Sequence, residues 1–373
     1  MNPFIYGGVV EGKDFANREK EMKELETYLT QAQNVLLTAP RKYGKTSLII
    51  NTLNRLRRKG ALCAYINLSK VTSLHCLLRI YLKEVALEAE KDKQKALVLF
   101  RSLLPKTYAQ MEIDFDDLMD PGFKNMDRNG IRKAAKEVFD LPQKVAVSKN
   151  RPFVMAFNEF QEIEELDGER ILRTFKSCVK KNNKISYFFS RTNTDNPSEL
   201  KKLEKDFNID RVLELQKIPR SQLASYLTDK FTKTGYRLEK GVLDKVLSEV
   251  NDYPYNAQFL CHELWVLKSQ KKDILLKDVD TTLSEIIKRH SPFYVSTWDN
   301  LTARQRNVLR AIARLGGEQV FSQEFARAGG VGSLSTLQTS IQLLKKKQIL
   351  TRSDNRYEFT DVFFRKWIST EIN

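Results

Sequence analysis

The sequence predicts an α/β protein in which a doubly wound parallel sheet is followed by a small helical lid and a C-terminal winged helix. Three observations lead to this fold class. Short apolar runs alternate with helical periodicity up to residue 217, helical patterns alone fill residues 218–297, and three helical patterns followed by a hairpin pattern end the chain. We therefore expect three domains: residues 1–217 with a helical insertion at 71–143, residues 218–297, and residues 298–373.

The composition is that of a globular protein with a strongly basic charge. The chain has 373 residues, of which 41% are hydrophobic and 29% charged, and this length favours more than one core. It lacks eighteen consecutive apolar residues and a signal-peptide pattern at its start, so we expect a cytoplasmic protein with no membrane partner. The net charge of +16 favours polyanions such as nucleic acid, although solvated lysine-rich helices explain it equally well.

The first part of the chain shows the strands and helices of the sheet in alternation. A helical pattern at residues 17–29 precedes an apolar run at 34–38, a helix at 47–56 and a second run at 62–68. Strand, helix and strand at this spacing predict a parallel unit with a right-handed crossover. Further strands are expected at residues 153–157, 185–189 and 211–215. The insertion is mostly helical in pattern, with a loop expected at residues 113–122.

The segment after the first strand, Ala39-Pro40-Arg41-Lys42-Tyr43-Gly44-Lys45-Thr46, fits the phosphate-loop pattern G-x-x-x-x-G-K-[ST] except at its first residue. Backbone N–H groups of such a loop surround phosphate oxygens, Lys45 reaches the outer phosphates, and the Thr46 hydroxyl ligates magnesium. The helix that follows from Ser47 adds its positive dipole end. Because the motif follows a buried strand and opens a helix, we expect residues 39–47 to bind ATP or ADP with Mg²⁺.

Polar side chains follow two later strands, at the sheet edge where ligands bind. Asn158 and Glu159 come directly after the run at residues 153–157, where an Asp-Glu pair is usual. Glu159 is the candidate catalytic base, and Asn158 is a candidate magnesium partner through a water, poorer than Asp because its amide is neutral. Arg191, after the run at residues 185–189, is the candidate sensor of the terminal phosphate. A solvated acidic turn and a surface arginine are the alternative interpretations.

The combined motifs resemble those of the archaeal-type P-loop ATPases of the STAND and AAA+ group, relatives of the origin-recognition initiators. The similar segments are residues 15–19, 39–48, 157–163, 252–261 and 359–368. This resemblance implies an AAA+/STAND-like P-loop sheet whose lid reports the bound nucleotide, with Pro254 near the base and sugar and Arg191 near the terminal phosphate. Departures from the family pattern at Ala39, Asn158 and Asp252 imply an ATPase that binds nucleotide but turns it over slowly.

The last two domains are predicted from helical periodicity. The lid helices are expected at residues 219–234, 239–251, 254–268 and 276–290, with no strand between them. The winged helix is expected to have helices at residues 304–315, 322–328 and 335–346 and a hairpin of strands at 349–352 and 357–360.

In a winged helix the third helix enters the major groove of DNA. Its polar residues here are candidate contacts to bases or phosphates, and basic residues from its end and from the hairpin are candidate phosphate contacts. These candidates are Ser335, Thr336, Gln338, Thr339, Lys345, Lys346, Lys347, Arg352 and Arg356. The third helix has no arginine or asparagine for a bidentate base contact, so a protein-binding role for the domain stays open.

Two functions are consistent with these features. The first is a slowly hydrolysing, ATP-driven switch that moves a winged helix bound to double-stranded DNA, which the basic charge favours. The second is a nucleotide-binding regulatory or scaffold protein with little turnover, whose lid and winged helix bind a protein partner or a second copy of the chain. Asn158 favours the second function.

Overall fold

The computed structural model describes the whole chain except residues 16, 105–106, 108–127, 167, 194–195, 269, 354–355 and 373. The loop expected at residues 113–122, Ala16 of the entry motif and the hairpin residues 354–355 lie outside the described residues. The chain forms two compact units. The sheet unit comprises Glu11–Ala39 and Lys45–Leu215, and the C-terminal unit comprises Met1–Val10, Pro40–Gly44 and Gln216–Asn373.

A five-stranded sheet forms the centre of the sheet unit. Its strands are β1 (Val35–Ala39), β2 (Leu62–Asn67), β3 (Phe153–Asn158), β4 (Ile185–Thr192) and β5 (Arg211–Glu214). They pair in the order β2-β3-β4-β1-β5, and every pairing is parallel. The predicted doubly wound parallel sheet is therefore confirmed. β1 to β4 are almost entirely buried, which explains why they appear in the sequence as unbroken apolar runs.

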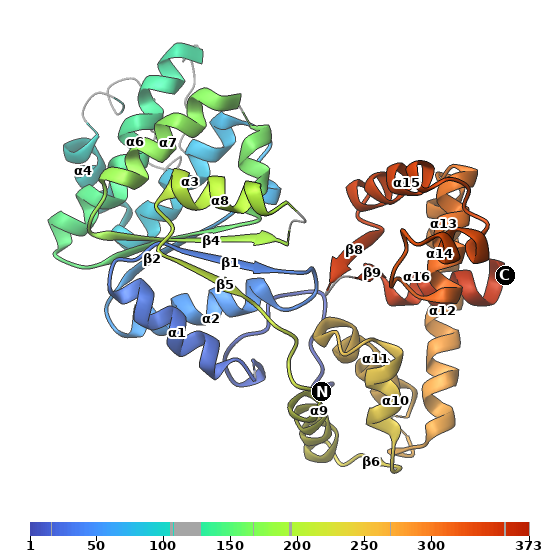
Figure 1. Cartoon of the computed structure of the whole chain (residues 1–373). Coiled ribbons are helices and arrows are strands. Elements are labelled where there is room, and N and C mark those ends of the chain that lie inside the picture. Colours follow the sequence, from blue (N-terminus) through green and yellow to red (C-terminus); the bar gives the residue numbers. More distant parts are fainter. Residues whose placement is uncertain are drawn as a thin grey trace. The chain divides into compact units, whose positions relative to one another are not determined.

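Helices cover both faces of this sheet (Figure 1). α1 (Glu19–Thr30) and α2 (Lys45–Arg58) lie on one face, and α3 (Leu74–Ala89), α6 (Arg128–Lys149), α7 (Gly168–Lys181) and α8 (Pro197–Phe207) lie on the other. The insertion also contains α4 (Lys93–Leu103), and short 3-10 turns occur at Gly12–Asp14, Leu68–Lys70 and Phe160–Glu165. Aromatic rings fill the core on the second face, where Phe189 packs against Phe157 at 5.7 Å and against Phe207 at 5.3 Å.

Two elements of the sheet unit extend further than the sequence pattern predicts. β4 continues through Ser190, Arg191 and Thr192 because these residues pair with Leu37, Thr38 and Ala39 of β1. α6 continues to Lys149, beyond the expected end of the insertion at residue 143, and contains Pro142. In both places tertiary pairing or packing holds a regular backbone that the local residue types do not favour.

The lid part of the C-terminal unit contains α9 (Arg220–Lys233), α10 (Val242–Glu249), α11 (Pro254–Leu267) and the start of α12 (Leu276–Asp299). The prediction of no strand in this region is wrong. Two residues of β6 (Arg237–Leu238) pair in parallel with two of β7 (Asp273–Ile274). Strands this short show no alternation of apolar and polar residues, so periodicity could not find them.

α12 runs to Asp299, nine residues beyond the expected end of the fourth lid helix, and includes Pro292. Its last turns carry Tyr294 and Trp298, whose rings lie 6.0 and 6.2 Å from that of Trp367. This aromatic packing stabilises the helix after the proline, where the missing N–H would otherwise favour a stop. The expected boundary between lid and winged helix, at residues 297 and 298, lies within α12.

The winged helix has the predicted order of three helices and a hairpin. Its elements are α13 (Ala303–Leu315), α14 (Gln323–Gly329), α15 (Leu334–Lys346), β8 (Leu350–Ser353), β9 (Arg356–Phe359), α16 (Val362–Trp367) and a π-helical turn at Ile368–Ile372. Gly317 lets the hairpin approach closely, because a Cβ there would lie 1.7 Å from the Tyr357 carbonyl oxygen. None of the described helices is long and apolar enough to cross a bilayer.

Candidate nucleotide-binding site

The phosphate loop begins where β1 ends at Ala39 and closes where α2 begins at Lys45. Lys42 and Gly44 have positive φ angles of 66° and 88°, a turn that glycine adopts without strain and that explains the glycine of the motif at Gly44. The Lys45 ammonium donates a 3.1 Å hydrogen bond to the Ala39 carbonyl across the loop. Thr46 is half-buried and Ser47 is buried in the first turn of α2. Their N–H groups lie at the helix end that attracts anions.

The carboxyl ends of β3 and β4 place polar side chains around Lys45. Its ammonium lies 3.9 Å from the Glu159 carboxylate and 3.5 Å from the Thr192 hydroxyl. Thr192 in turn donates a 3.1 Å hydrogen bond to Glu159. Glu159 has φ 54° and ψ 51°, a left-handed conformation that is costly for a glutamate and that often occurs at functional sites. A cation, a hydroxyl and a carboxylate thus meet at the end of the sheet.

The amide of Asn158 is fixed by its neighbours. Asn158 is 3% exposed, and its Oδ1 accepts a 2.7 Å hydrogen bond from the Ser190 hydroxyl on the adjacent strand. It also hydrogen-bonds to Tyr65 of β2, whose pKa burial raises to about 12. These two contacts give the Asn158 amide a defined orientation at the strand end.

The structure gives Arg191 a partner in the protein. Its guanidinium contacts Glu199 of α8 at 2.5 Å, and the residue is 5% exposed. Thr192 is the residue of this strand that contacts Lys45 and Glu159, although no sequence motif marks it as a site residue. The signal for it is the register, since Thr192 pairs with Ala39, the residue that starts the phosphate loop.

The residues at the strand ends offer oxygen atoms, which are the ligands that magnesium prefers. Thr46 contributes a hydroxyl, Asn158 an amide oxygen and Glu159 a carboxylate. Among the described residues, Oε1 of Gln161 and Oδ1 of Asn193 are buried and have no hydrogen-bond partner. Gln161 also donates a 2.7 Å hydrogen bond to Glu159. This set of oxygen atoms fits a hydrated Mg²⁺ ion, for which Thr46 would be the direct ligand.

The tip of the phosphate loop belongs to the C-terminal unit, where it packs against the start of α11. Tyr43 is 4% exposed, and its ring lies edge-on to that of Tyr253 at 5.4 Å. Lys42 donates a 3.4 Å hydrogen bond to Asn256 and lies 5.3 Å above the Tyr255 ring. Burial lowers the pKa of Lys42, and Asp361 opposes this shift. Pro254, the candidate base and sugar contact, is the first residue of α11.

Tyr253, which contacts Tyr43 of the loop tip, also contacts the wing. Its phenol donates a 2.5 Å hydrogen bond to Glu358 of β9, which is 6% exposed. Burial, together with the negative charge of Glu358, raises the pKa of Tyr253. Glu358 also forms an ion pair with Arg356, one of the candidate phosphate contacts. A buried carboxylate thus receives one partner from the lid and one from the wing.

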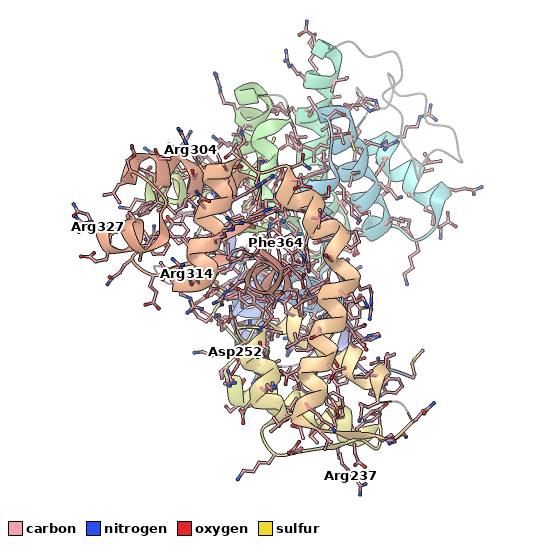
Figure 2. All side chains as sticks on the ribbon, turned by 90° about the vertical axis from the view of Figure 1, so that its right-hand side faces the viewer. Arg237, Asp252, Arg304, Arg314, Arg327 and Phe364 are labelled. Atoms are coloured by element: carbon pink, nitrogen blue, oxygen red, sulfur yellow. The ribbon has the colours of Figure 1, made fainter. Side chains whose placement is uncertain are left out.

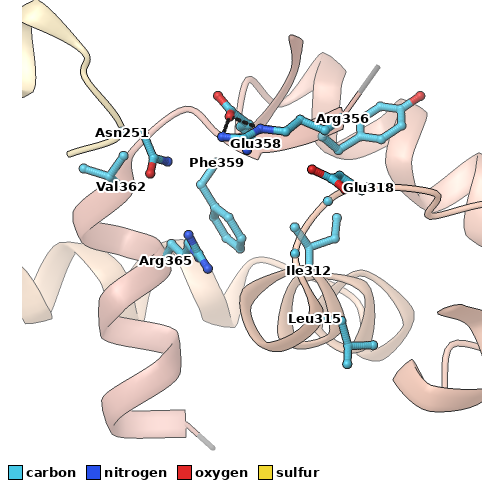
Figure 3. Close-up of a pocket in the computed structure, with 12 residues that line it drawn as sticks. Asn251, Ile312, Leu315, Glu318, Arg356, Glu358, Phe359, Val362 and Arg365 are labelled. Atoms are coloured by element: carbon cyan, nitrogen blue, oxygen red, sulfur yellow. Dashed lines mark hydrogen bonds and ion pairs between the residues drawn. The ribbon is translucent and has the colours of Figure 1, made fainter. Parts of the chain in front are cut away.

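A cavity of about 340 Å³ lies beside this ion pair. Figure 3 shows Arg356 and Glu358 joined at its rim, with Arg365 and Asn251 at the other side and Ile312 and Leu315 below. Its wall is mixed in polarity, and its residues come from the lid as well as from the winged helix.

The candidate DNA contacts lie on α15 and the hairpin. Ser335, Gln338, Thr339 and Lys346 are exposed and Thr336 is half-buried. Lys347 donates a 2.9 Å hydrogen bond to the Asn300 carbonyl, and burial lowers the pKa of Lys345. Arg352 lies 5.9 Å above the Tyr357 ring. Arg356 is paired with Glu358, and its side chain remains 39% exposed.

The fold is that of a P-loop protein with a C-terminal winged helix. The family model described as "Probable winged helix domain" matches residues 292–370. The Walker-type ATPase of Pyrococcus abyssi has a similar structure, with a TM-score of 0.63 and 16% identity over 98% of this chain and 99% of that chain.

Two origin-recognition proteins of Aeropyrum pernix are similar as well. The ORC2 protein gives a TM-score of 0.57 with 12% identity, over 100% of this chain and 98% of that chain. The ORC1 protein, solved in complex with DNA, gives 0.53 with 13% identity, over 96% and 93%. At these identities the likeness is one of fold. No curated protein matches the sequence.

Proposed function

We propose that this chain is an ATP-dependent switch that binds ATP with Mg²⁺ at its phosphate loop and thereby controls a winged helix that contacts double-stranded DNA. The cluster of Lys45, Thr192 and Glu159 at the carboxyl end of the sheet carries the proposal. It combines a cation that attracts the outer phosphates with a carboxylate able to orient a water, beside the N-terminus of α2.

Nucleotide binding changes the partners of Lys45. Its ammonium exchanges the Ala39 carbonyl and the Thr192 hydroxyl for phosphate oxygens, which are stronger acceptors. Thr192 keeps Glu159 oriented as the base that takes a proton from the attacking water. A bound Mg²⁺ ion supplies charge stabilisation at the outer phosphates. The neutral Asn158 makes turnover slow, because an amide binds the waters of the ion less strongly than a carboxylate does.

The contacts of the loop tip supply the coupling. The Tyr43 ring packs against the Tyr253 ring, and the Tyr253 phenol donates a hydrogen bond to Glu358. Glu358 in turn forms an ion pair with Arg356. A change in the loop that shifts Tyr43 disturbs the hydrogen bond to Glu358, and the loss of this bond frees or reorients Arg356 in the wing. Coupling free energies of this kind are about 1–3 kcal/mol, and by linkage DNA must change nucleotide affinity by the same factor.

The partner of the winged helix is proposed on three grounds. The chain carries a net charge of +16, which attracts polyanions. Polar side chains are exposed along the first turns of α15, the helix that enters the groove in domains of this type. One protein with a similar fold, the ORC1 protein of Aeropyrum pernix, was solved in complex with DNA.

The test measures nucleotide binding and DNA binding together. Calorimetry gives the affinity for ATP, and fluorescence anisotropy with a labelled duplex gives the DNA Kd without nucleotide, with ADP and with a non-hydrolysable ATP analogue. We expect the Kd values in the nucleotide states to differ by about 5–150-fold. Equal Kd values in all three states would show that the nucleotide does not control the winged helix.

The alternative is a nucleotide-binding regulatory or scaffold protein whose lid and winged helix bind a protein partner. The ion pair between Arg356 and the buried Glu358 favours this alternative, since Arg356 is one of the side chains expected to bind phosphate. The mixed lining of the cavity beside Glu358 also suits a peptide segment. Nucleotide binding without any duplex binding at low salt would favour this alternative.

A further inference from the structure

Helix α13, the first of the winged helix, carries an unusual charge distribution. Its sequence from Ala303 to Leu315 contains four arginines and no acidic residue. Arg306, Arg310 and Arg314 recur every four residues, so they lie on one face at steps of about 6 Å. Like charges at this spacing destabilise a helix by roughly 0.2–0.5 kcal/mol for each pair. The two pairs together cost up to about 1 kcal/mol, and a bound polyanion would offset this cost.

Within the protein this compensation is weak. Arg306 is the member that lies near a carboxylate, at 3.7 Å from the exposed Asp299. The guanidinium groups of Arg306 and Arg310 lie 5.7 and 5.5 Å from the centre of the Trp298 ring, so both make cation–π contacts with it. Arg310 and Arg314 donate to backbone carbonyls, those of Ile372 and Ala328. Carbonyl contacts orient these side chains, and no carboxylate of the described residues forms an ion pair with either of them.

Helix α14 adds a further arginine to this surface. Gly329 at its end packs directly on α13, where a Cβ would lie 2.7 Å from that of Ala311. Arg314 reaches the Ala328 carbonyl, the residue next to Arg327, so the two arginines belong to one corner of the domain. Figure 2 shows Arg314 and Arg327 in the same part of the winged helix, with Arg304 above them. Among the described residues, no carboxylate pairs with Arg310, Arg314 or Arg327, and all three are exposed.

We propose that Arg310, Arg314 and Arg327, here called the arginine face, bind the phosphate backbone of double-stranded DNA. In helix-turn-helix domains the helix before the recognition helix crosses the DNA backbone, and α14 with Arg327 holds that position here. The guanidinium groups provide bidentate donors for phosphate oxygens, which lysine ammonium groups do not. The inference rests on the proposed function that the winged helix contacts DNA, and it adds a surface outside α15 and the hairpin.

A duplex is favoured over an acidic protein because the face consists of exposed guanidinium groups with few exposed apolar side chains. Among the described residues of α13 and α14, Leu315 is the large apolar side chain that is exposed, at 44%. A protein interface of useful affinity normally has a buried aromatic or aliphatic centre. A backbone contact needs only charge and donors at regular spacing.

The test compares three variants of the full chain for binding to a short duplex of mixed sequence over a range of salt concentrations. The first is R310Q/R314Q/R327Q, and the second, R310K/R314K/R327K, keeps the charge. The matched control K240Q/K277Q/K288Q removes the same charge from exposed lysines of the lid. Circular dichroism and thermal unfolding confirm that each variant is folded.

We expect the glutamine variant to lower the log–log salt slope by about 0.9 for each phosphate that is no longer neutralised, up to about 2.7. The lysine variant should keep most of the slope, and the lid control should change it much less than the glutamine variant does. If the glutamine variant binds the duplex as tightly as the wild type, or no more weakly than the lid control, the arginine face is not a DNA-binding surface. The proposal that the protein binds DNA would not be affected by that result. Wild type that fails to bind any duplex at low salt overturns the proposed function as well.

Discussion

The phenol of Tyr253 donates a 2.5 Å hydrogen bond to the carboxylate of Glu358, 105 residues further along the chain. Tyr253 precedes the lid helix α11, and Glu358 lies in the second strand of the wing. A carboxylate that is 6% exposed requires partners, and it has Tyr253 on one side and Arg356 on the other. The Tyr43 ring rests against Tyr253, so one buried group connects the phosphate-loop tip to the wing.

Replacement of Tyr253 with phenylalanine tests this connection. The Tyr253→Phe variant keeps the ring against Tyr43 but leaves Glu358 without its lid partner. We expect a loss of about 1–3 kcal/mol in the free energy of unfolding, because a buried acceptor loses its donor. We also expect the ratio of DNA Kd values with and without nucleotide to move toward one. Denaturant unfolding and fluorescence anisotropy measure the two quantities.

A matched control separates coupling from general destabilisation. Tyr236 is also a buried lid tyrosine, and its phenol donates a 2.7 Å hydrogen bond to the Trp265 carbonyl, away from the wing. The Tyr236→Phe variant should lose a similar amount of stability and keep the nucleotide effect on DNA binding. If both variants alter that effect equally, the path through Glu358 is not the coupling route.

Removal of the Lys45 ammonium tests the phosphate site itself. In Lys45→Ala the backbone of the loop remains, but the cation that is proposed to bind the outer phosphates is gone. Loss of one partner from a buried charge pair costs roughly 2–5 kcal/mol, so ATP affinity should fall by about thirtyfold or more. Calorimetry of this variant is compared with Arg58→Ala, which removes an exposed charge from the end of the same helix. Unchanged affinity in Lys45→Ala would refute the phosphate-loop assignment.

Substitutions of Asn158 and Glu159 should have opposite effects on the rate of ATP turnover. An aspartate at position 158 can accept the Ser190 hydrogen bond just as the amide oxygen does, so the fold should tolerate Asn158→Asp. The added charge strengthens the hold on hydrated magnesium, and we expect ATP turnover to rise by roughly 10–100-fold. Glu159→Gln should abolish turnover and preserve binding. Fast turnover in the wild type, unaffected by Asn158→Asp, would contradict this account of Asn158.

Much of the fold follows from the sequence, because its signals are local. The five strands are found where the apolar runs predict them, and the segment predicted as a phosphate loop lies between β1 and α2. The errors occur where tertiary contacts decide the backbone. β4 extends to Thr192 through pairing with β1, and α12 passes Pro292 because Tyr294 and Trp298 pack against Trp367.

Individual residues of the candidate site could be predicted from the sequence, but the contacts between them could not. Lys45 and Glu159 are identifiable from motif and position, and they lie 3.9 Å apart. Thr192 is not, because its role depends on register with Ala39. The contact between Tyr253 and Glu358 joins residues with no shared motif and no regular spacing. Arg191 was assigned from its position after a strand and from the family resemblance, and Arg356 from its charge and position. The structure pairs both with carboxylates.

The lysines at the end of α15 provide the remaining test of the winged helix. Lys346 is exposed, whereas Lys347 donates to the Asn300 carbonyl and burial lowers the pKa of Lys345. If all three bind phosphates, changing them together to glutamine should weaken binding to every duplex and lower the salt slope by about 0.9 for each phosphate that they neutralise. Lys347 is bound to a carbonyl and Lys345 is partly buried, so we expect the salt slope to decrease by an amount closer to that of one phosphate contact than of three.

Gln338→Ala provides the complementary measurement on the same helix. Gln338 is exposed in the second turn of α15 and carries no charge, so its replacement should leave the salt slope unchanged. It should alter only the preference among duplex sequences, which a competition assay with a set of duplexes detects. The lid control K240Q/K277Q/K288Q again measures the effect of net charge alone. The duplex affinity could stay unchanged in both the lysine variant and Gln338→Ala and yet decrease in R310Q/R314Q/R327Q. That result would assign the DNA contact to α13 and α14 instead of α15.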